Sequence, residues 1–206
     1  TPTPMPTDTP TSMPTDTPTP RPHWTATPSP SPSPIVLSQG TGAGNAIALT
    51  FDCGSDRGNA PAILEFLRRH GIAATFGVTG RWAELNPDLV RQMVAQGDQI
   101  VNHTYDHRSF TGFSTSSAAM STAEIAGELA LADEVIRHIT GSSTRPYYRS
   151  PYGDESQASL AAAAADGYSI DVRWSIDSLG WNGLSAARIE ARVLGAAAPG
   201  SIVLMH

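Results

Sequence analysis

The 206-residue sequence predicts an α/β fold, and most simply a (β/α) barrel with room for fewer than eight complete units. Near-continuous apolar runs of strand length alternate with segments of about 10 to 20 residues that have the apolar spacing of helices. Strands that are apolar on both faces belong to a parallel sheet covered by helices on both sides. An open doubly wound sheet is the alternative, but the glycine-rich segment at 40–44 precedes the first strand, whereas a dinucleotide-binding fingerprint would follow it.

The first half of the predicted domain alternates strictly between strand and helix. In order, the expected elements are a strand at 46–51, a helix at 59–71, a strand at 72–78, a helix at 86–97 and a strand at 99–102. Asn59 can cap the first helix, with Pro61 in its first turn and Gly71 at its end. An Asn-Pro-Asp sequence opens the second helix, and Gly97 closes it.

The second half continues the alternation with longer helices. The expected elements are a helix from about 121 to 138, an apolar stretch at 146–148, an alanine-rich helix at 157–165, a strand at 168–176, a helix at 186–194 and a strand at 201–205. The chain stops at His206, directly after this apolar strand and without a covering helix. We therefore expect a domain truncated at its C-terminus.

Residues 1–40 are predicted to be a disordered linker, and residues 41–206 a single globular domain. Twelve of the 17 prolines lie before residue 35, in a Thr/Pro/Ser tract that can form neither helix nor sheet. This composition is also typical of O-glycosylated stalks outside the cell. We expect an extracellular or cell-wall-associated protein, in which the tract either joins an upstream module to the domain or acts as a plain spacer.

Composition and charge exclude several functions. All 13 basic residues are arginines, so there is no Schiff-base lysine, pyridoxal phosphate anchor or Walker-type phosphate loop. A formal net charge of −6 without a basic patch argues against a nucleic-acid partner. No apolar run approaches the ~20 residues of a membrane helix. The single cysteine excludes an internal disulfide framework.

Polar side chains gather where the predicted strands end. They are Asp52 and Cys53 after the first strand, His103 and His107 after the third, Arg149 after the next apolar stretch, Asp177 after the strand at 168–176, and His206 after the last. In a parallel β-α fold the chemistry lies at the C-terminal ends of the strands. Five strand ends that each deliver an ionisable side chain to one rim predict an active site.

His103 and His107 suggest a metal site within it. On a helical turn, residues i and i+4 share a face, so both imidazoles could reach one cation. A catalytic metal needs a third ligand and an open position for water. Asp52 or Cys53 could be that ligand, and a thiolate beside two imidazoles would suit zinc. The alternative for Cys53 is a small buried apolar side chain.

These residues carry a resemblance to a known family. Five motifs occur in order, namely Thr50-Phe51-Asp52-Cys53-Gly54, His103-Thr104-x-x-His107, Arg149-Ser150-Pro151-Tyr152, Asp177-Ser178-x-x-Trp181 and Leu204-Met205-His206. Residues 46–206 thereby resemble the NodB-type polysaccharide deacetylases, carbohydrate esterase family 4. The resemblance implies a distorted (β/α) barrel and a metal-dependent hydrolase that removes acetyl groups from an acetylated polysaccharide of N-acetylglucosamine, such as peptidoglycan or chitin. Some members instead cleave O-acetyl esters on xylan.

The resemblance also implies a role for each residue near the reacting atoms. Asp52 would be the general base, and Arg149 would keep it ionised. His103 and His107 would hold a divalent metal, zinc or alternatively cobalt, which activates water and polarises the acetyl carbonyl. His206 would be the general acid that protonates the leaving amine, and the motif containing Asp177 would support it.

The remaining residues would shape the acetyl pocket. The backbone N–H of Tyr152 would stabilise the oxyanion, and Trp181 and Leu204 would wall the pocket. The chain departs from the family pattern at Cys53, where most relatives have a metal-binding Asp, and at Gly180, where many have an Asp that tunes the acid histidine. These departures leave two alternatives open, a non-catalytic carbohydrate-binding member and a metal-independent hydrolase with Cys53 as nucleophile.

Overall fold

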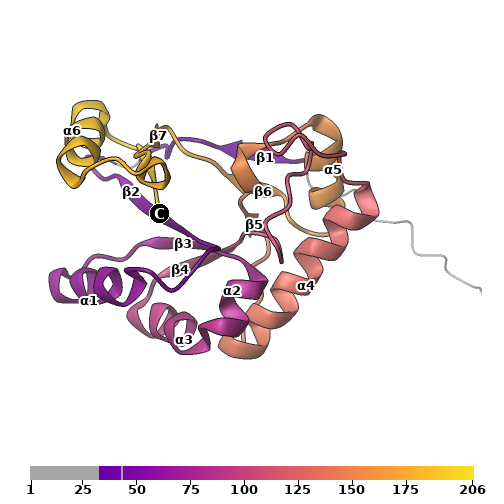
Figure 1. Cartoon of the computed structure of the whole chain (residues 1–206), viewed down its shortest axis with the longest axis horizontal. Helices are drawn as coiled ribbons and strands as arrows, with labels where there is room; N and C mark the ends of the chain where they lie inside the picture. Colours follow the sequence, from indigo (N-terminus) through magenta and orange to yellow (C-terminus); the bar gives the residue numbers. More distant parts are fainter. Residues whose placement is uncertain (1–32, 43) are drawn as a thin grey trace, which may run out of the picture. The chain divides into compact units, whose positions relative to one another are not determined.

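A computed structural model describes residues 33–42 and 44–206 of the chain. At its centre is a curled sheet of eight parallel strands in the order β1-β6-β5-β4-β3-β2-β8-β7 (Figure 1). The strands are β1 (Ile35–Leu37), β2 (Ala48–Cys53), β3 (Thr75–Val78), β4 (Gln99–Asn102), β5 (Tyr147–Tyr148), β6 (Ile170–Val172), β7 (Ile176–Asp177) and β8 (Ile202–Met205). The predicted α/β fold with a distorted barrel is confirmed.

Six α-helices connect these strands in the described part of the chain (Figure 1). They are α1 (Ala60–His70), α2 (Gly80–Leu85), α3 (Pro87–Gln96), α4 (Thr122–Thr140), α5 (Gln157–Ala165) and α6 (Ala186–Ala196). Gly71 and Gly97 end α1 and α3 in the left-handed conformation that the sequence predicts for them. Ser121 and Glu124 form a capping box at the start of α4, which satisfies two backbone N–H groups there.

The register of the sheet brings the C-terminal ends of its central strands together. Asp52 on β2 pairs with Gly77 on β3, and Val78 at the end of β3 pairs with Asn102 at the end of β4. The apolar side chains that hold this part of the sheet to α1 and α3 form one buried cluster, which includes Phe51, Leu64 and Phe76. Because the strand ends are fixed in this way, the residues that follow them lie at a common rim.

The structure differs from the sequence prediction at the edges of elements. Strand β1 lies inside the range assigned to the linker, because Ile35, Val36 and Leu37 pair with β6. The domain therefore includes residues before 41, and the rest of the linker prediction, 1–32, lies outside the described residues. Helix α2 was not expected, since six residues are too few to show a helical apolar pattern.

The strand predicted at 168–176 is two strands. β6 pairs with β1 and β5, whereas β7 pairs with β8 at the other end of the strand order. Residues 173–175 lead from one end of the sheet to the other, because Arg173 N–H donates to the carbonyl of Leu37 in β1 and Ser175 N–H donates to the carbonyl of Ile202 in β8. None of the helices in the described ranges is both long and apolar enough to cross a membrane.

Candidate active site

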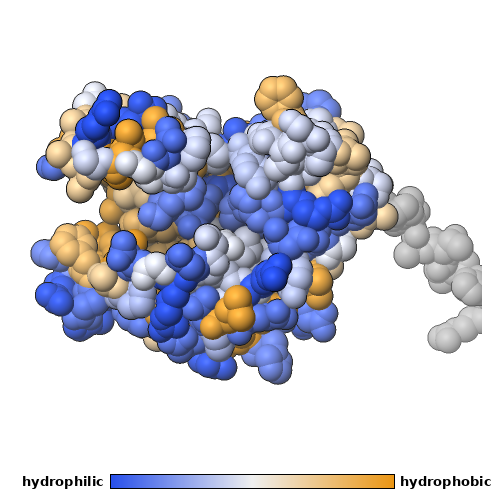
Figure 2. All heavy atoms as spheres, in the orientation of Figure 1, coloured by the Kyte–Doolittle hydropathy of each residue, from blue (hydrophilic) through white to orange (hydrophobic). Residues whose placement is uncertain are grey.

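A cavity of about 1090 Å³ opens at the C-terminal ends of the strands. Figure 2 shows this face hollowed between α1 and α6. Nine of the ten site residues predicted from the sequence line this cavity, namely Asp52, Cys53, His103, His107, Tyr152, Asp177, Trp181, Leu204 and His206. The tenth, Arg149, is fully buried. The structure therefore brings side chains from five strand ends to one place.

Asp52 and Arg149 form a buried ion pair beside the cavity. Arg149 Nη1 donates a 2.6 Å hydrogen bond to Asp52 Oδ1. Burial alone would raise the pKa of Asp52, but the charges of His103 and Arg149 and the hydrogen bond from Arg149 lower it below its ordinary value. Asp52 is therefore held as a carboxylate, the form that can accept a proton.

Thr50 completes the hydrogen bonding of Arg149. Residues i and i+2 of a strand face the same side, so Thr50 and Asp52 both point toward the guanidinium. Arg149 Nη2 donates to Thr50 Oγ1 at 2.9 Å, and Arg149 Nε donates to the carbonyl of Val172 at 2.6 Å. The guanidinium is thus fixed at three points. Thr50 stands in the first sequence motif, but its contact with Arg149 was not predicted, although a polar side chain two residues before Asp52 in an apolar strand was a usable signal.

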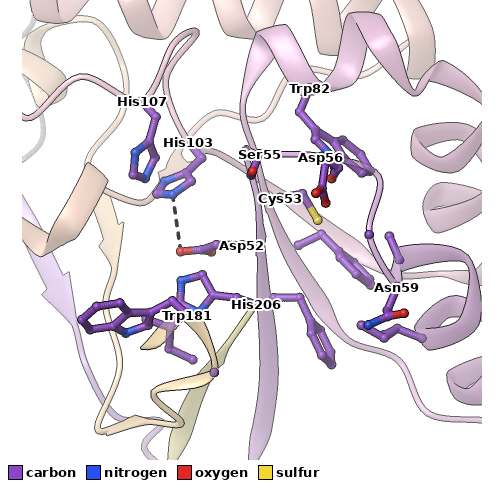
Figure 3. Close-up of a pocket in the computed structure, with 18 of the residues that line it drawn as sticks. Asp52, Cys53, Ser55, Asp56, Asn59, Trp82, His103, His107, Trp181 and His206 are labelled. Carbon is purple, nitrogen blue, oxygen red and sulfur yellow. Dashed lines mark hydrogen bonds and ion pairs between the residues drawn. The ribbon is translucent and has the colours of Figure 1, made fainter. Parts of the chain in front are cut away.

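His103 presents one ring nitrogen to Asp52. Its Nδ1 lies 2.9 Å from the carbonyl oxygen of Arg149, which can only accept, so Nδ1 carries the proton. Its Nε2 lies 3.4 Å from Asp52 Oδ2 (Figure 3). Nε2 is therefore the ring nitrogen that faces the site, the arrangement found in metal-binding histidines whose other nitrogen donates to a carbonyl.

His107 lies next to His103 but not on a helical turn. Thr104 and His107 both have positive φ angles, near 64° and 65°, so the segment is a loop that folds back on itself. This corrects the expected geometry, yet the two rings still meet edge to face with centroids 4.6 Å apart. Burial, with the neighbouring His103, lowers the pKa of His107 to about 4, so its imidazole is neutral at pH 7.

His206 lies across Asp52 from these imidazoles (Figure 3), and Asp177 lines the same cavity. Burial lowers the pKa of His206, while the charges of Asp52 and Asp177 act in the opposite direction. The Asp177 carboxylate accepts hydrogen bonds from Leu179 N–H at 2.8 Å and from the Trp181 indole at 3.3 Å. Asp177 therefore also positions Trp181, a contact that sequence reasoning did not reveal.

Cys53 is directed away from the two imidazoles. It follows Asp52 in β2, and adjacent residues of a strand face opposite sides. Its side chain packs against the apolar cluster below α1, and Figure 3 shows the sulfur on the side of Asn59. Burial and the nearby Asp52 charge raise the pKa of the thiol to about 12. The structure therefore does not bring Cys53 together with His103 and His107 as a thiolate.

Tyr152 has a left-handed backbone conformation, with φ near 61°. It lies in a short 3-10 turn, where Gly153 N–H donates to Ser150 and Asp154 N–H donates to Pro151. Neither turn bond uses the N–H of Tyr152, as expected for the start of such a turn. A non-glycine residue in this region is strained, and such strain concentrates at functional sites.

The donor set suits a divalent cation in part. His103 Nε2 faces the cavity beside Asp52 Oδ2, and imidazole nitrogens are common ligands of zinc. A second imidazole, His107, adjoins His103. Within the described ranges, however, no three side chains of His, Cys, Asp or Glu stand together as a complete cation site. Two imidazoles therefore supply part of a cation site next to the Asp52 carboxylate, without a finished set of ligands.

Comparison with known proteins gives a consistent result. A model of the family described as polysaccharide deacetylase matches residues 39–170. A peptidoglycan-N-acetylglucosamine deacetylase of Bacillus cereus is 34% identical over 160 residues, which are 78% of this chain and 55% of that protein. A chitooligosaccharide deacetylase of Bradyrhizobium is 35% identical over 161 residues, which are 78% of this chain and 70% of that protein. The chain thus spans little more than half of the first of these relatives.

Solved structures share the fold as well. A crystal structure of a peptidoglycan N-acetylglucosamine deacetylase has a TM-score of 0.73 at 32% identity, covering 83% of this chain and 75% of that one. A pseudoenzyme of carbohydrate esterase family 4 from Bacillus anthracis has a TM-score of 0.75 at 27% identity, covering 84% of this chain and 59% of that one. The fold is therefore common to relatives described as deacetylases and to one described as a pseudoenzyme.

Proposed function

Because the chain belongs to the polysaccharide deacetylase family, we propose that it removes N-acetyl groups from a polymer that contains N-acetylglucosamine, such as peptidoglycan or chitin. The observation that carries the proposal is the Asp52 carboxylate, which is paired with buried Arg149 and lies 3.4 Å from His103 at the floor of the cavity. The reaction is hydrolysis of an amide, which needs a base for water and an acid for the departing nitrogen.

Asp52 would act as the base. Its lowered pKa keeps it ionised at neutral pH, and Arg149 holds the carboxylate in one orientation. As water attacks the acetyl carbonyl, one proton of the water passes to Asp52 Oδ2, the oxygen that Arg149 Nη1 does not contact. The carbonyl carbon becomes tetrahedral and its oxygen gains negative charge.

His103 and His107 would hold a divalent cation at this point, with zinc expected and cobalt as the alternative. A bound cation lowers the pKa of water and polarises a carbonyl. His103 is oriented for this by its bond to the Arg149 carbonyl, and His107 is neutral because its pKa is about 4. The backbone N–H of Tyr152 would donate to the developing oxyanion.

His206 would act as the acid. An amide nitrogen cannot leave as an anion, so the carbon–nitrogen bond breaks only as His206 delivers a proton to that nitrogen. Acetate and a free amine on the sugar are the products. Burial lowers the pKa of His206, and Asp177 would favour the protonated imidazole because its charge opposes that effect. Trp181 and Leu204 would enclose the acetyl methyl group, because both line the cavity.

The proposal places the protein outside the cell or at the cell wall. One of the relatives above is described as a peptidoglycan deacetylase, which supports a cell-wall context. The Thr/Pro/Ser composition of the first 34 residues favours a linker, which would join an upstream module to the deacetylase domain.

Acetate release from N-acetylated chitohexaose tests this function. We expect acetate from the wild-type chain and a loss of turnover of roughly 1,000-fold in Asp52→Asn, which keeps the shape of the side chain but cannot accept the proton. Acetylxylan, tested in parallel, distinguishes an O-acetyl esterase. Full activity of Asp52→Asn would show that another group is the base.

A non-catalytic carbohydrate-binding protein is the second candidate, and two positions favour it. Cys53 stands where most members of the family pattern have Asp, Gly180 where many do, and one structural relative is described as a pseudoenzyme. A Cβ atom added at Gly180 would make only ordinary contacts, 3.5 Å from Ser178 Oγ and 4.0 Å from the backbone nitrogen of His206. Binding of chitohexaose without acetate release under any metal would support this candidate.

A further inference from the structure

The loop at residues 109–120 carries the most exposed aromatic side chain of the described residues. We call it the rim loop, and it connects β4 to α4 (Figure 1). Phe113 at its tip is 86% exposed. Exposing a phenyl ring to water is unfavourable in proportion to its exposed apolar area, and no contact within the fold requires Phe113 to be exposed. The exposed ring is therefore available to a ligand outside the fold.

Asp154 holds the rim loop in place. Its Oδ2 accepts hydrogen bonds from Ser109 Oγ at 2.6 Å and from Ser114 N–H at 2.8 Å. Its Oδ1 accepts a third from Ser114 Oγ at 2.7 Å. Burial alone would raise the pKa of Asp154, but these bonds lower it below its ordinary value, so the charged acceptor persists at neutral pH. One carboxylate thus fixes the residue next to Phe113.

The base of the rim loop is anchored in the core. Phe110 and Met120 are both buried, and Met120 N–H donates to the Phe110 carbonyl at 3.0 Å. Gly112 has a φ of +75°, and a Cβ atom there would overlap the carbonyl of Ser117. Ser117 N–H in turn donates to the Gly112 carbonyl at 3.1 Å. The loop is therefore internally bonded, and its backbone is held in one position on either side of Phe113.

The rim loop is continuous with the active-site cavity. Ser114 lines the cavity, and Phe113 precedes it directly. Asp154 is two residues after Tyr152, whose ring lies 4.5 Å from that of His107. Asp154 therefore ties the loop to the short turn that carries Tyr152. Phe113 lies one residue from the cavity lining, within reach of a polymer that extends past Ser114.

We propose that Phe113 is a sugar-stacking residue for the polysaccharide, and that Asp154 is the positioning residue that holds it at the rim. The apolar face of a pyranose ring, one or more units from the sugar being deacetylated, would lie on the phenyl ring. An aromatic ring on a fixed loop offers such a face at little cost in conformational entropy. The inference takes its substrate from the proposed function and rests on it. It adds that the protein prefers longer polysaccharide chains to shorter ones.

Steady-state kinetics on N-acetylated chitobiose and chitohexaose test this inference. In Phe113→Ala the ratio of kcat/KM for the hexamer to that for the dimer should fall roughly three- to tenfold, mainly through KM. Phe113→Tyr, which keeps a ring, should restore the ratio. Asp154→Ala should also lower this ratio of kcat/KM values, even though that variant still carries Phe113. Phe66→Ala is the matched control, because Phe66 is also an exposed phenylalanine but lies on α1 against His70.

Binding to the Asp52→Asn protein, measured by calorimetry, separates the inference from the proposed function. Adding Phe113→Ala should weaken the affinity for chitohexaose three- to tenfold more than that for chitobiose. Should the wild-type chain release no acetate, the catalytic proposal fails, while this affinity difference still supports a sugar-stacking role. An equal change for both oligomers, or none in Phe113→Ala, would overturn the inference.

Discussion

Gly77 lies beside Asp52 in the neighbouring strand, and its missing side chain leaves the space that the carboxylate occupies. The two residues are register partners, and a Cβ atom on Gly77 would overlap Asp52 Oδ1. This role could not be predicted from sequence, because a glycine in a strand has several uses. It becomes apparent only once the pairing of β2 and β3 is known.

Gly77→Ala should therefore displace the base without removing it. We expect kcat to fall about 10- to 100-fold, since a shift of about 1 Å in a catalytic group has effects of this size. Gly127→Ala is the control, because no atom lies within 4 Å of a Cβ atom at that helical position. That variant should retain activity and gain about 0.5–1 kcal/mol in unfolding free energy. Wild-type kcat in Gly77→Ala would contradict the geometry of the site.

Cys53 illustrates a residue whose role the sequence left open between a ligand and a buried apolar side chain. The structure places it against the apolar cluster, with a thiol pKa of about 12. Because the thiolate is disfavoured at pH 7, Cys53→Ala should change zinc affinity less than twofold, as measured by competition with a chelating dye. A loss of tenfold or more would show that the thiolate is a ligand. His103→Ala and His107→Ala, in contrast, should abolish stoichiometric binding.

At the scale of elements, β6 carries a buried acid beneath the turn that contains Tyr152. Asp171 Oδ2 accepts a hydrogen bond from Ser150 Oγ at 2.7 Å, and Asp171 Oδ1 accepts one from Ser150 N–H at 3.1 Å. Burial, together with the nearby Glu155, raises the pKa of Asp171 to about 7. The folded protein therefore keeps a proton on Asp171 at a pH where the unfolded chain has lost it.

This difference fixes the sign of a pH effect on stability. Between about pH 4 and pH 7 the folded state binds one more proton at Asp171 than the unfolded state. The contribution of Asp171 to the unfolding free energy therefore falls as the pH rises. Urea unfolding should give the difference in unfolding free energy between Asp171→Asn and wild type at each pH. This difference should favour the variant by at least about 1 kcal/mol more at pH 8 than at pH 5. The opposite sign, or no difference, would show that Asp171 is ionised in the folded state.

Elements with strong end signals were predictable from sequence. α1 and α3 begin with a proline in the first turn and end at Gly71 and Gly97, and both were found as expected. The division between β6 and β7 was not predictable, because both strands begin with the same Ile-Asp pair and differ mainly in their partners. Likewise, the loop conformation at His107 depends on its positive φ angle, which no local pattern requires.

At the scale of the whole molecule, the site depends on the topology more than on any local motif. Asp52 and Arg149 are 97 residues apart, yet they form a 2.6 Å hydrogen bond because β2 and β5 end at the same rim of one parallel sheet. The sequence could predict that these ends converge, since parallel strands place their chemistry on one side. It could not predict which face each side chain takes where a strand bends.

The requirement for a cation is the central claim, and acetate release by metal-free and metal-loaded protein tests it most directly. We predict that a chelator abolishes acetate release from chitohexaose, and that one equivalent of zinc or cobalt restores it to the wild-type chain but not to His103→Ala. Acetate release that continues unchanged in the metal-free protein would contradict the account.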